Sequence, residues 1–328
     1  MKVLVTGGGG FLGRYIVEKL LERGDNVSIF CRGFYPDLEE MGVKIIRGNL
    51  KDRDVVIDAI KGHEIVFHVA SKIDMYGKYE DFYDINVVGT QNVVDGCIKG
   101  GIFKLIYTST ASVVFNGRNL KGVDESVPYS DKFLAPYPKT KMLAEQIVIK
   151  ANGINGLKTT ILRPHLIWGP RDPSLAPRLI AVAKKGRLPI IGHGDNKLDI
   201  TYVENVADAH ILAADSPKSA GQVYFISQGE PVVPWDFLNK VFSRMDIPQI
   251  KRKIPYKFAY IGGAILEFLF KVFRVRNKQP LITRFLASEL SKSHYFDISK
   301  AERELGYEPK VSLEEGIDRY LEYYFYHN

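Results

Sequence analysis

A tyrosine and a lysine in the stretch PYPKTK are the first residues whose types and spacing suggest chemistry. Tyr137 and Lys141 stand four positions apart, so they would share one face of a helix. An ordinary tyrosine has a pKa of about 10, but a cation one helical turn away stabilises the phenolate and lowers that pKa. The pair could therefore act as a general acid–base between a carbinol and a carbonyl. Alone, the same spacing also fits two surface residues.

A cluster of hydroxyl groups in the stretch LIYTSTASVV could hold the oxygen of such a substrate. Thr108, Ser109, Thr110 and Ser112 come directly after an expected strand. Open parallel sheets bind their ligands at the carboxyl ends of the strands, where one of these hydroxyls could bind the reacting oxygen. Because hydroxyl residues are also common in turns, the cluster gains weight only in combination with the tyrosine and the lysine.

The N-terminal stretch MKVLVTGGGGFLG predicts a strand, a glycine-rich turn and the start of a helix. Two fingerprints fit it: Gly8, Gly10 and Gly13 form G-x-G-x-x-G, whereas Thr6, Gly7, Gly10 and Gly13 form T-G-x-x-G-x-x-G. In such a turn the backbone amides and the helix N-terminus offer positive partial charge to a pyrophosphate. The stretch therefore predicts a dinucleotide site in either register.

The end of the second expected strand, in SIFCRG, favours NADP over NAD. NAD enzymes usually carry an acid there for the ribose 2′-hydroxyl, but this chain has Cys31 and Arg32. Asp25 precedes the strand and should lie at the opposite end of the sheet. Arg32 could pair with a 2′-phosphate; the alternative is an exposed loop arginine.

Short apolar runs alternate with longer amphipathic runs, and these elements must position the residues named so far. Strands are expected at Val3–Val5, Val27–Phe30, Val43–Ile46, Ile65–His68, Lys104–Tyr107 and 157–164, and helices at Leu12–Arg23, Asp54–Ile60, Phe82–Lys99, 136–151 and Ser312–Tyr324. This alternation predicts an α/β fold with a doubly wound, Rossmann-type parallel sheet. We expect a dinucleotide-binding domain at 1–165 with returning segments near 200–228, and a smaller, interleaved substrate-binding region at 166–328.

Over nearly its whole length the sequence resembles the extended short-chain dehydrogenases/reductases. The resemblance is carried by TGGGGFLG, HVAS, DINVVGT, YTSTASV, PYPKTK, LRPHLIWGP, DITYVENVADAH and KAERELGYEP. It implies an NAD(P)-dependent oxidoreductase in which Thr110 binds the substrate oxygen, with Ser109 and Ser112 as the next candidates. It further implies that Tyr137 is the acid–base, and that Lys141 lowers the pKa of this tyrosine and binds the nicotinamide ribose.

The resemblance also implies a set of cofactor-binding residues. It selects the T-G-x-x-G-x-x-G register, which makes Gly8 and Gly9 variable positions. The family often has an acid after the third strand, where this chain has Asn49. His68 and Asn86 equally fit buried, satisfied polar groups. The implied set is Thr6, Gly7, Gly10, Phe11, Leu12, Gly13, Arg32, Asn49, Leu50, His68, Ala70, Ser71, Asn86, Tyr137, Lys141, Pro164, Leu166 and Ile167.

Within that class the sequence is most similar to the 3β-hydroxysteroid dehydrogenase-like branch. The stretches CRGFYPDLEEMGV, LRPHLIWGPRD, YFISQGEP and QPLITRFLASEL resemble the 2-alkyl-3-oxoalkanoate reductases of bacterial long-chain olefin biosynthesis. That resemblance implies reduction by NADPH of a β-keto acid with long alkyl chains to the 3-hydroxy acid. Steroid dehydrogenation is an alternative.

Two other function classes are possible on the same fold. A sugar-nucleotide epimerase or dehydratase would hold NAD tightly and would need polar groups for a diphosphate, a role open to Arg171 and Arg178. A cofactor sensor or scaffold would have no use for a catalytic set, so the presence of Thr110, Tyr137 and Lys141 together argues against it.

The net charge of +7 is concentrated in one segment of the chain. Residues 251–278 carry eight cations and one anion, Glu267, which leaves 37 basic and 37 acidic residues in the remainder. This distribution argues against a nucleic-acid partner. The segment 256–278 is also strongly apolar, and Glu267, Lys271, Arg274 and Lys278 would share one helical face. We consider three interpretations of a helix near 256–276: a core helix, a lid over a hydrophobic substrate, or a peripheral membrane contact.

The sequence says less about the cellular compartment and the oligomeric state of the protein. Cys31 and Cys97 have neither metal-ligand spacing nor the number expected of a disulfide framework. Reduced thiols predict a cytoplasmic protein, with possible peripheral contact with the membrane, and no metal site is expected. A homodimer is a further expectation from the resemblance.

Overall fold

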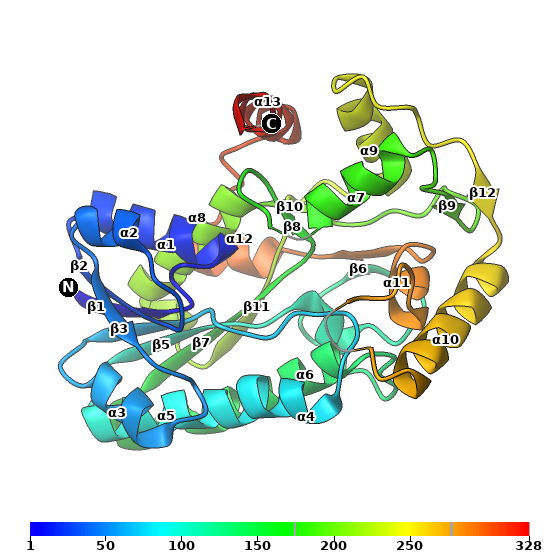
Figure 1. The fold of residues 1–328 in the computed structure, drawn as a ribbon. Coiled ribbons are helices and arrows are strands. Elements are labelled where there is room, and N and C mark those ends of the chain that lie inside the picture. The colour runs from blue at the N-terminus through cyan, green and yellow to red at the C-terminus, as the bar shows by residue number, and fades with distance from the viewer. Residues whose placement is uncertain (174, 276–277, 328) are drawn as a thin grey trace.

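A seven-stranded, fully parallel sheet lies at the centre of the molecule (Figure 1). The computed structural model describes residues 1–173, 175–275 and 278–327. The strand order is β11-β7-β5-β4-β1-β2-β3, so the chain runs outward from β1 in both directions. The strands are β1 (Lys2–Thr6), β2 (Asn26–Cys31), β3 (Lys44–Arg47), β4 (Ile65–His68), β5 (Lys104–Thr108), β7 (Lys158–Pro164) and β11 (Gln222–Ile226).

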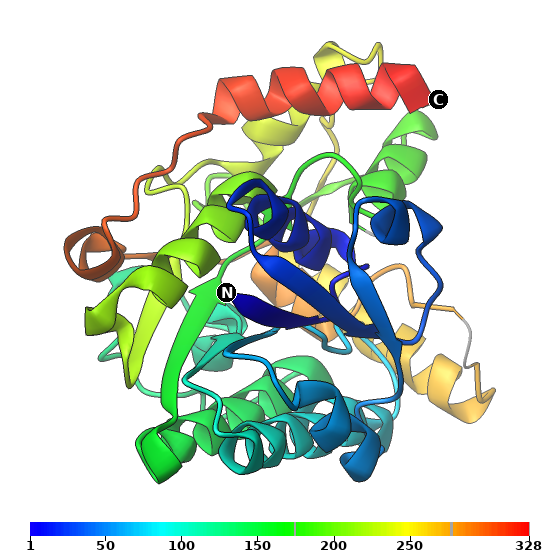
Figure 2. The same cartoon turned by 90° about the vertical axis from the view of Figure 1, so that its left-hand side faces the viewer.

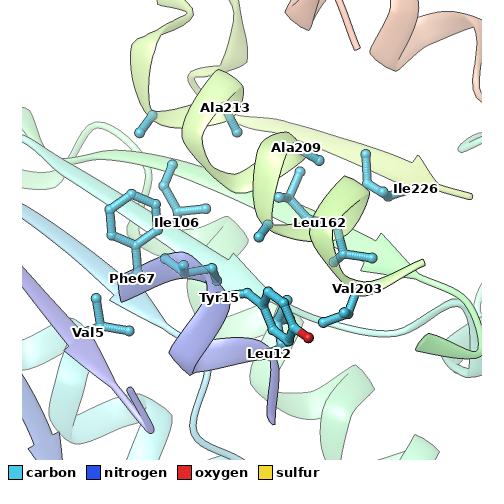
Figure 3. Packing of buried hydrophobic residues seen from close by; sticks show 14 of the residues in the cluster. Val5, Leu12, Tyr15, Phe67, Ile106, Leu162, Val203, Ala209, Ala213 and Ile226 are labelled. Atoms are coloured by element: carbon cyan, nitrogen blue, oxygen red, sulfur yellow. The ribbon is translucent and has the colours of Figure 1, made fainter. Parts of the chain in front are cut away.

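Helices cover both faces of this sheet (Figures 1 and 2). One face carries α1 (Phe11–Glu22) and α8 (Val203–Asp215), and the other carries α3 (Arg53–Ile60), α5 (Gly89–Gly100) and α6 (Pro136–Ala151). Figure 3 shows the first face, where Leu12 and Tyr15 of α1 and Val203 and Ala209 of α8 pack over the strands. A separate core of aliphatic and aromatic side chains fills the second face. The predicted doubly wound α/β fold is confirmed.

The expected elements match the structure apart from one helix. The predicted helix Phe82–Lys99 consists of a short α4 (Tyr79–Phe82), a π-helical turn at Tyr83–Val88 and α5. π-Helical turns are rare and often occur at functional sites. Here the turn carries the buried Asn86, whose amide bonds to residues outside the helix. The residue pattern is helical throughout, so periodicity alone could not reveal the change of pitch.

The remaining elements lie at the carboxyl edge of the sheet and around it. The strand β11 pairs with β7 at the edge of the sheet. In the sequence, 57 residues separate these two strands. Short parallel pairs join β8 to β10, β9 to β12 and β6 to β13. These elements are α2 (Pro36–Glu40), β6 (Leu120–Val123), β8 (Ile167–Trp168), α7 (Leu175–Lys184), β9 (Ile190–Ile191), β10 (Thr201–Tyr202), α9 (Pro234–Ser243), β12 (Lys253–Ile254), α10 (Tyr256–Val272), α11 (Arg284–Glu289), β13 (His294–Phe296), α12 (Ser299–Leu305) and α13 (Leu313–His327).

The basic, apolar segment forms α10 but does not have the predicted arrangement. It is not a core helix, because Gly263 is its one buried residue. The helix ends at Val272, so Arg274, with a φ of 52°, and Lys278 lie beyond it and do not continue its face. Glu267 turns inward instead and bonds to Arg284. Among the described residues, no helix combines the length and the apolar character needed to span a bilayer.

Candidate active site

The predicted catalytic residues come together where β5 ends and α6 begins. β5 ends at Thr108, and Thr110 then caps a short 3-10 helix at Ala111–Val114 by accepting a hydrogen bond from the backbone N–H of Ser112 at 3.2 Å. α6 begins with Pro136 in its first turn, where proline is favoured because its missing N–H would have no partner. Tyr137 and Lys141 thus lie one helical turn apart beside the end of β5.

Thr110 and Tyr137 form the contact that a carbonyl-reducing site needs. The hydroxyl of Thr110 lies close enough to that of Tyr137 to lower the pKa of the tyrosine. Thr110 is only 8% exposed, while Tyr137 is partly exposed. A substrate oxygen placed at these two hydroxyls would meet a proton donor and an orienting group together. Of the three candidate hydroxyls, Thr110 is the one in contact with the tyrosine.

Lys141 is buried beneath the carboxyl edge of the sheet, where its ammonium contacts the end of β5. Its ammonium Nζ donates a hydrogen bond to the carbonyl of Thr108 at 2.6 Å and lies 4.3 Å from the centre of the Tyr107 ring. Burial lowers the pKa of Lys141 to about 7, an effect that the nearby Glu145 carboxylate partly offsets. The lysine therefore links α6 to the backbone that precedes the catalytic hydroxyls.

The expected effect of the lysine on the tyrosine is not what the structure shows. We expected Lys141 to lower the pKa of Tyr137, but burial raises this pKa to about 12, and the hydrogen bond from Thr110 only partly counteracts it. The reason is that the ammonium of Lys141 points to Thr108, as described above. In this state Tyr137 keeps its proton at neutral pH, which suits it to donate a proton.

A buried ion pair lies behind the catalytic residues on α6. Glu145 accepts hydrogen bonds from Arg163 (Nη2 to Oε1, 2.5 Å), from the hydroxyl of Tyr129 at 2.8 Å and from the hydroxyl of Ser109 at 2.5 Å. Ser109 is thereby committed to a carboxylate and is not available as the substrate-binding hydroxyl. Sequence reasoning missed Glu145, although its position one turn after Lys141 places it on the same helical face.

A second buried acid, Glu289 of α11, reaches the site from far along the chain. Its Oε1 accepts a hydrogen bond from the hydroxyl of Ser112 at 3.1 Å, and its charge acts on Tyr137. Burial raises the pKa of Glu289 to about 7. Its backbone carbonyl lies 2.9 Å from Nε2 of His294, and Nδ1 of His294 lies 2.8 Å from Nε2 of His165. No local sequence signal points to Glu289, because its partner is 177 residues away.

The glycine turn fits a dinucleotide pyrophosphate. Gly7 has a φ of +72°, which favours glycine, and a Cβ at Gly13 would lie 2.1 Å from the carbonyl oxygen of Gly7. Gly10 is exposed at the N-terminus of α1, and the nearest atom to a Cβ there would be 3.2 Å away. The turn thus brings bare backbone to a helix N-terminus, where anions bind. The left-handed Gly7 favours the Thr6-Gly7 register.

Gly8 and Gly9, the positions that the fingerprint leaves variable, have close neighbours in this structure. A Cβ at Gly8 would lie 2.3 Å from Cγ2 of Ile29 in the sheet core, and a Cβ at Gly9 would lie 2.2 Å from the ring of Tyr35. Gly8 is needed for packing against the buried Ile29, whereas at Gly9 the end of the partly exposed Tyr35 side chain would have to shift; neither glycine has a positive φ. The run of four glycines therefore serves close packing as well as the turn.

His68, Thr6 and Asn86 belong to a buried network that supports the site. Thr6 Oγ1 lies 2.7 Å from Nδ1 of His68, whose Nε2 lies 2.9 Å from the hydroxyl of Thr90. Burial lowers the pKa of His68 to about 3, so it is neutral. Asn86 donates to the hydroxyl of Thr140 at 3.0 Å and also bonds the backbone of Lys72. These partners support the interpretation of His68 and Asn86 as satisfied buried polar groups.

The other predicted cofactor residues surround the same edge of the sheet. Arg32 is exposed directly after β2, and Asp25 lies at the opposite end of that strand, where it bonds the N-terminal amine. Ala70 and Ser71 follow β4, Pro164 ends β7, and Ile167 starts β8. Leu12 and Leu50 point into the two cores, while Phe11 stacks edge-on with Tyr15. Asn49 follows β3, and Leu166 adopts a φ of 38° between β7 and β8.

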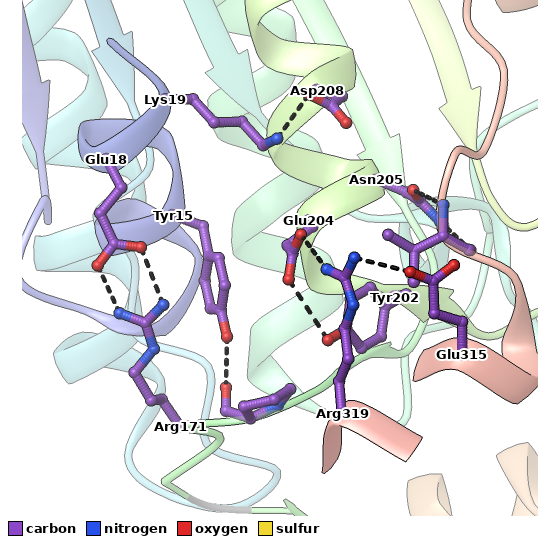
Figure 4. A network of polar contacts seen from close by, with 12 residues as sticks. Tyr15, Glu18, Lys19, Arg171, Tyr202, Glu204, Asn205, Asp208, Glu315 and Arg319 are labelled. Carbon is purple, nitrogen blue, oxygen red and sulfur yellow. Dashed lines mark hydrogen bonds and ion pairs between the residues drawn. The ribbon is translucent and has the colours of Figure 1, made fainter. Parts of the chain in front are cut away.

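The two arginines considered for a diphosphate have protein partners, and Figure 4 shows those of Arg171. Arg171 makes a two-pronged ion pair with Glu18, at 2.6 and 2.9 Å, and lies over the ring of Tyr15 at 4.1 Å. Arg178 donates to the backbone carbonyls of Pro280 and Leu281. Neither guanidinium is positioned to receive a phosphate in this arrangement.

The fold and the site define the class: this chain has the Rossmann sheet, glycine turn and Thr-Tyr-Lys set of an NAD(P)-dependent extended short-chain dehydrogenase/reductase. The 3-beta hydroxysteroid dehydrogenase/isomerase family model matches residues 4–256, and the chain belongs to this family. The expected branch is thus confirmed.

Curated relatives cover almost the whole chain. A "2-alkyl-3-oxoalkanoate reductase" of Stenotrophomonas maltophilia is 45% identical over 97% of this chain and 98% of its own length. A protein of the same name from Shewanella oneidensis is 43% identical over 96% of this chain and 84% of its own. The mouse "Sterol-4-alpha-carboxylate 3-dehydrogenase, decarboxylating" is 38% identical over 97% of this chain and 89% of its own length.

Solved structures share the fold. The crystal structure of gox2253 covers 99% of this chain and 98% of its own, with 26% identity and a TM-score of 0.82. The UDP-glucuronic acid 4-epimerase from Bacillus cereus in complex with NAD covers 100% of this chain and 99% of its own, with 23% identity and a TM-score of 0.78. The second likeness concerns the fold alone.

Proposed function

We propose that this enzyme uses NADPH to reduce the ketone of a long-chain 2-alkyl-3-oxoalkanoate to the 3-hydroxy acid. The contact of Thr110 with Tyr137, beside the buried Lys141, carries the proposal, because it joins a proton donor to an orienting hydroxyl. The 45% identity to a protein named for this reaction supports the substrate class.

In this mechanism Tyr137 supplies the proton. The ketone oxygen accepts hydrogen bonds from Tyr137 and Thr110, which polarise the carbonyl. As negative charge develops on that oxygen, the hydroxyl of Tyr137 transfers its proton to it. Because its pKa lies well above neutral pH, Tyr137 carries the proton that this step needs. An NADPH whose pyrophosphate is held at the glycine turn would supply the hydride to the carbonyl carbon.

Lys141 positions the backbone that precedes the catalytic hydroxyls and, as the family resemblance implies, would bind the nicotinamide ribose. It sits one turn from Tyr137 on α6, and its ammonium is held by the Thr108 carbonyl at 2.6 Å. Glu145, whose charge raises the pKa of Lys141 against the effect of burial, helps to keep that cation protonated.

Arg32 supports NADPH over NADH. It is exposed directly after β2, at the carboxyl edge where the adenosine ribose of a Rossmann cofactor lies. A guanidinium there can bind a 2′-phosphate through two parallel hydrogen bonds. Asp25, the acid nearest in sequence, is at the other end of the strand and pairs with the N-terminal amine at 2.8 Å.

The substrate panel that tests this proposal consists of long-chain 2-alkyl-3-oxo acids, 3-ketosteroids and UDP-sugars. Oxidation of NADPH is followed, and the reverse reaction is run on the 3-hydroxy acids, which do not lose CO2 spontaneously. We expect turnover on the oxo acids, with NADPH preferred to NADH. Arg32→Ala should reduce this preference, whereas the exposed Arg118→Ala control should not. Turnover on steroids or UDP-sugars alone would overturn the proposed substrate.

A further inference from the structure

The helix α10 presents an apolar face to the outside of the molecule. Phe258, Ile261, Ile265, Phe268 and Val272, here called the outer face of α10, are spaced three and four positions apart and are each between 53% and 71% exposed. Both ribbon views place α10 at the periphery (Figures 1 and 2). Monomeric proteins rarely leave so continuous an apolar patch uncovered, and such patches mark protein or membrane contacts.

The opposite face of α10 is fixed to the protein by specific contacts. Gly263 approaches the backbone of Thr283 so closely that a Cβ would lie 2.7 Å from it. Glu267 binds the backbone N–H of Arg284 at 2.7 Å and its Nε at 2.8 Å. The hydroxyl of Tyr76 donates to the carbonyl of Glu267 at 3.0 Å. Because this face is docked, the helix cannot bury its outer face by rolling over.

Exposed cations, here called the basic rim, lie on α10 and directly before and after it in the sequence; of these, Lys253 donates to the carbonyl of His193. None of them forms an ion pair with a residue in the part of the chain that the structure describes. An interfacial helix has this arrangement of apolar side chains and flanking Lys or Arg, and anionic headgroups attract such cations. The basic rim consists of the exposed Lys251, Arg252, Lys253, Lys257, Lys271, Arg274 and Lys278.

We propose that the outer face of α10 and its basic rim bind the surface of an anionic lipid bilayer. The alternative occupant, a second copy of this chain, fits the spacing of the apolar residues. However, two copies packed through this face would bring their basic rims together, and like charges repel. An anionic surface instead neutralises the same cations, so charge favours the lipid.

This orientation places the catalytic side of the enzyme next to the bilayer. α10 packs on α11, which carries Glu289, and Glu289 bonds Ser112 two residues after Thr110. On its other side α10 contacts Tyr76 in the segment between β4 and α4. A substrate with long alkyl chains would thus have a short path from a lipid surface to the site, a consequence that rests on the proposed function.

Vesicle sedimentation of the full-length protein tests the proposal. We expect binding to phosphatidylcholine–phosphatidylglycerol vesicles, weak binding to phosphatidylcholine alone, and a loss of at least about fivefold when salt is raised from about 0.1 M to about 0.5 M. Ile265→Glu combined with Phe268→Glu should abolish binding. Phe325→Glu, at an equally exposed phenylalanine of α13, is the matched control and should bind like the wild type.

Two results would overturn the proposal. One is equal binding to both vesicles that the double variant does not reduce. The other is a stable dimer in light scattering without lipid that the double variant converts to monomer, since the outer face would then be a contact between copies. Circular dichroism of each variant shows whether it is folded, and neither readout depends on which substrate the enzyme uses.

Discussion

Two helices of nearly equal length, α6 and α10, distribute their side chains in opposite ways. α6 buries polar residues, among them Lys141 and Glu145, whereas α10 buries only Gly263 and exposes aromatic and aliphatic side chains. Burying a charge is unfavourable unless it is paired, and on α6 every such group has a partner from another element. On α10 no described residue covers the apolar face. Both departures from ordinary burial mark positions where this protein meets something else: substrate and cofactor at α6, and by our proposal a lipid surface at α10.

The largest expected effect comes from removing the central acid of α6. Glu145→Ala leaves the guanidinium of Arg163 buried without its partner, and we expect a loss of about 3–5 kcal/mol in the free energy of unfolding. Urea denaturation measures it. The control is Asp58→Ala, which breaks an exposed pair with Lys61 and should cost less than about 0.5 kcal/mol. Equal effects of the two variants would show that burial does not distinguish these pairs.

Glu289 joins the two regions, and its effect should depend on pH. Burial raises its pKa to about 7 from 4.5, so the carboxyl of Glu289 ionises at a higher pH in the folded protein than in the unfolded chain. The stability from the neutral form is therefore complete below pH about 4.5 and is lost as pH rises through about 7. When the pH is raised from 5 to 8, we expect the free energy of unfolding of Glu289→Gln to rise by about 2 kcal/mol relative to that of the wild type. A gain that is the same at both pH values would contradict the assigned burial.

A smaller effect is expected from Thr140, which faces the π-helical turn. Its hydroxyl accepts a hydrogen bond from Asn86 at 3.0 Å and donates to the carbonyl of Pro136 at 3.0 Å. Thr140→Val removes both, and we expect a loss of about 1 kcal/mol in unfolding experiments. Thr140→Ser keeps the hydroxyl and should lose clearly less; if it loses as much as the valine variant, the methyl packing rather than the hydrogen bonds matters.

The smallest effect is expected on the outer face of α10. Phe268 is 65% exposed, so Phe268→Ser should change the free energy of unfolding by less than about 0.5 kcal/mol in the absence of lipid. Phe285 of α11, only 1% exposed, provides the contrast: Phe285→Ala should cost about 3–5 kcal/mol. A large loss for Phe268→Ser would mean that another part of the protein covers it in solution.

Sequence reasoning succeeded where one periodic element decides the geometry. The spacing of Tyr137 and Lys141 placed both on one helical face, and the strand before the glycines led correctly to a turn at the start of a helix. It failed where distant segments meet. Glu289 bonds a residue 177 positions away, and the direction in which the ammonium of Lys141 points is set by the end of β5.

Burial was the other property that local pattern could not supply. The apolar spacing of α10 is equally compatible with a core helix, and tertiary contacts such as those of Glu267 with Arg284 and of Gly263 with Thr283 show which face is docked. Similarly, Gly8 matched a variable position in the fingerprint, but its neighbour Ile29 on β2 leaves no room for a Cβ. Both depend on tertiary packing.

The central claim is that Tyr137 delivers the proton in an NADPH-dependent reduction, and the kinetics of Tyr137→Phe test it most directly. The variant keeps the ring but loses the hydroxyl that contacts Thr110. With a long-chain 2-alkyl-3-oxo acid as substrate, we predict a fall in kcat of about 10³-fold, together with an NADPH dissociation constant within about twofold of wild type. A variant that retains more than about a tenth of the wild-type kcat would contradict the claim, because another group would then be supplying the proton.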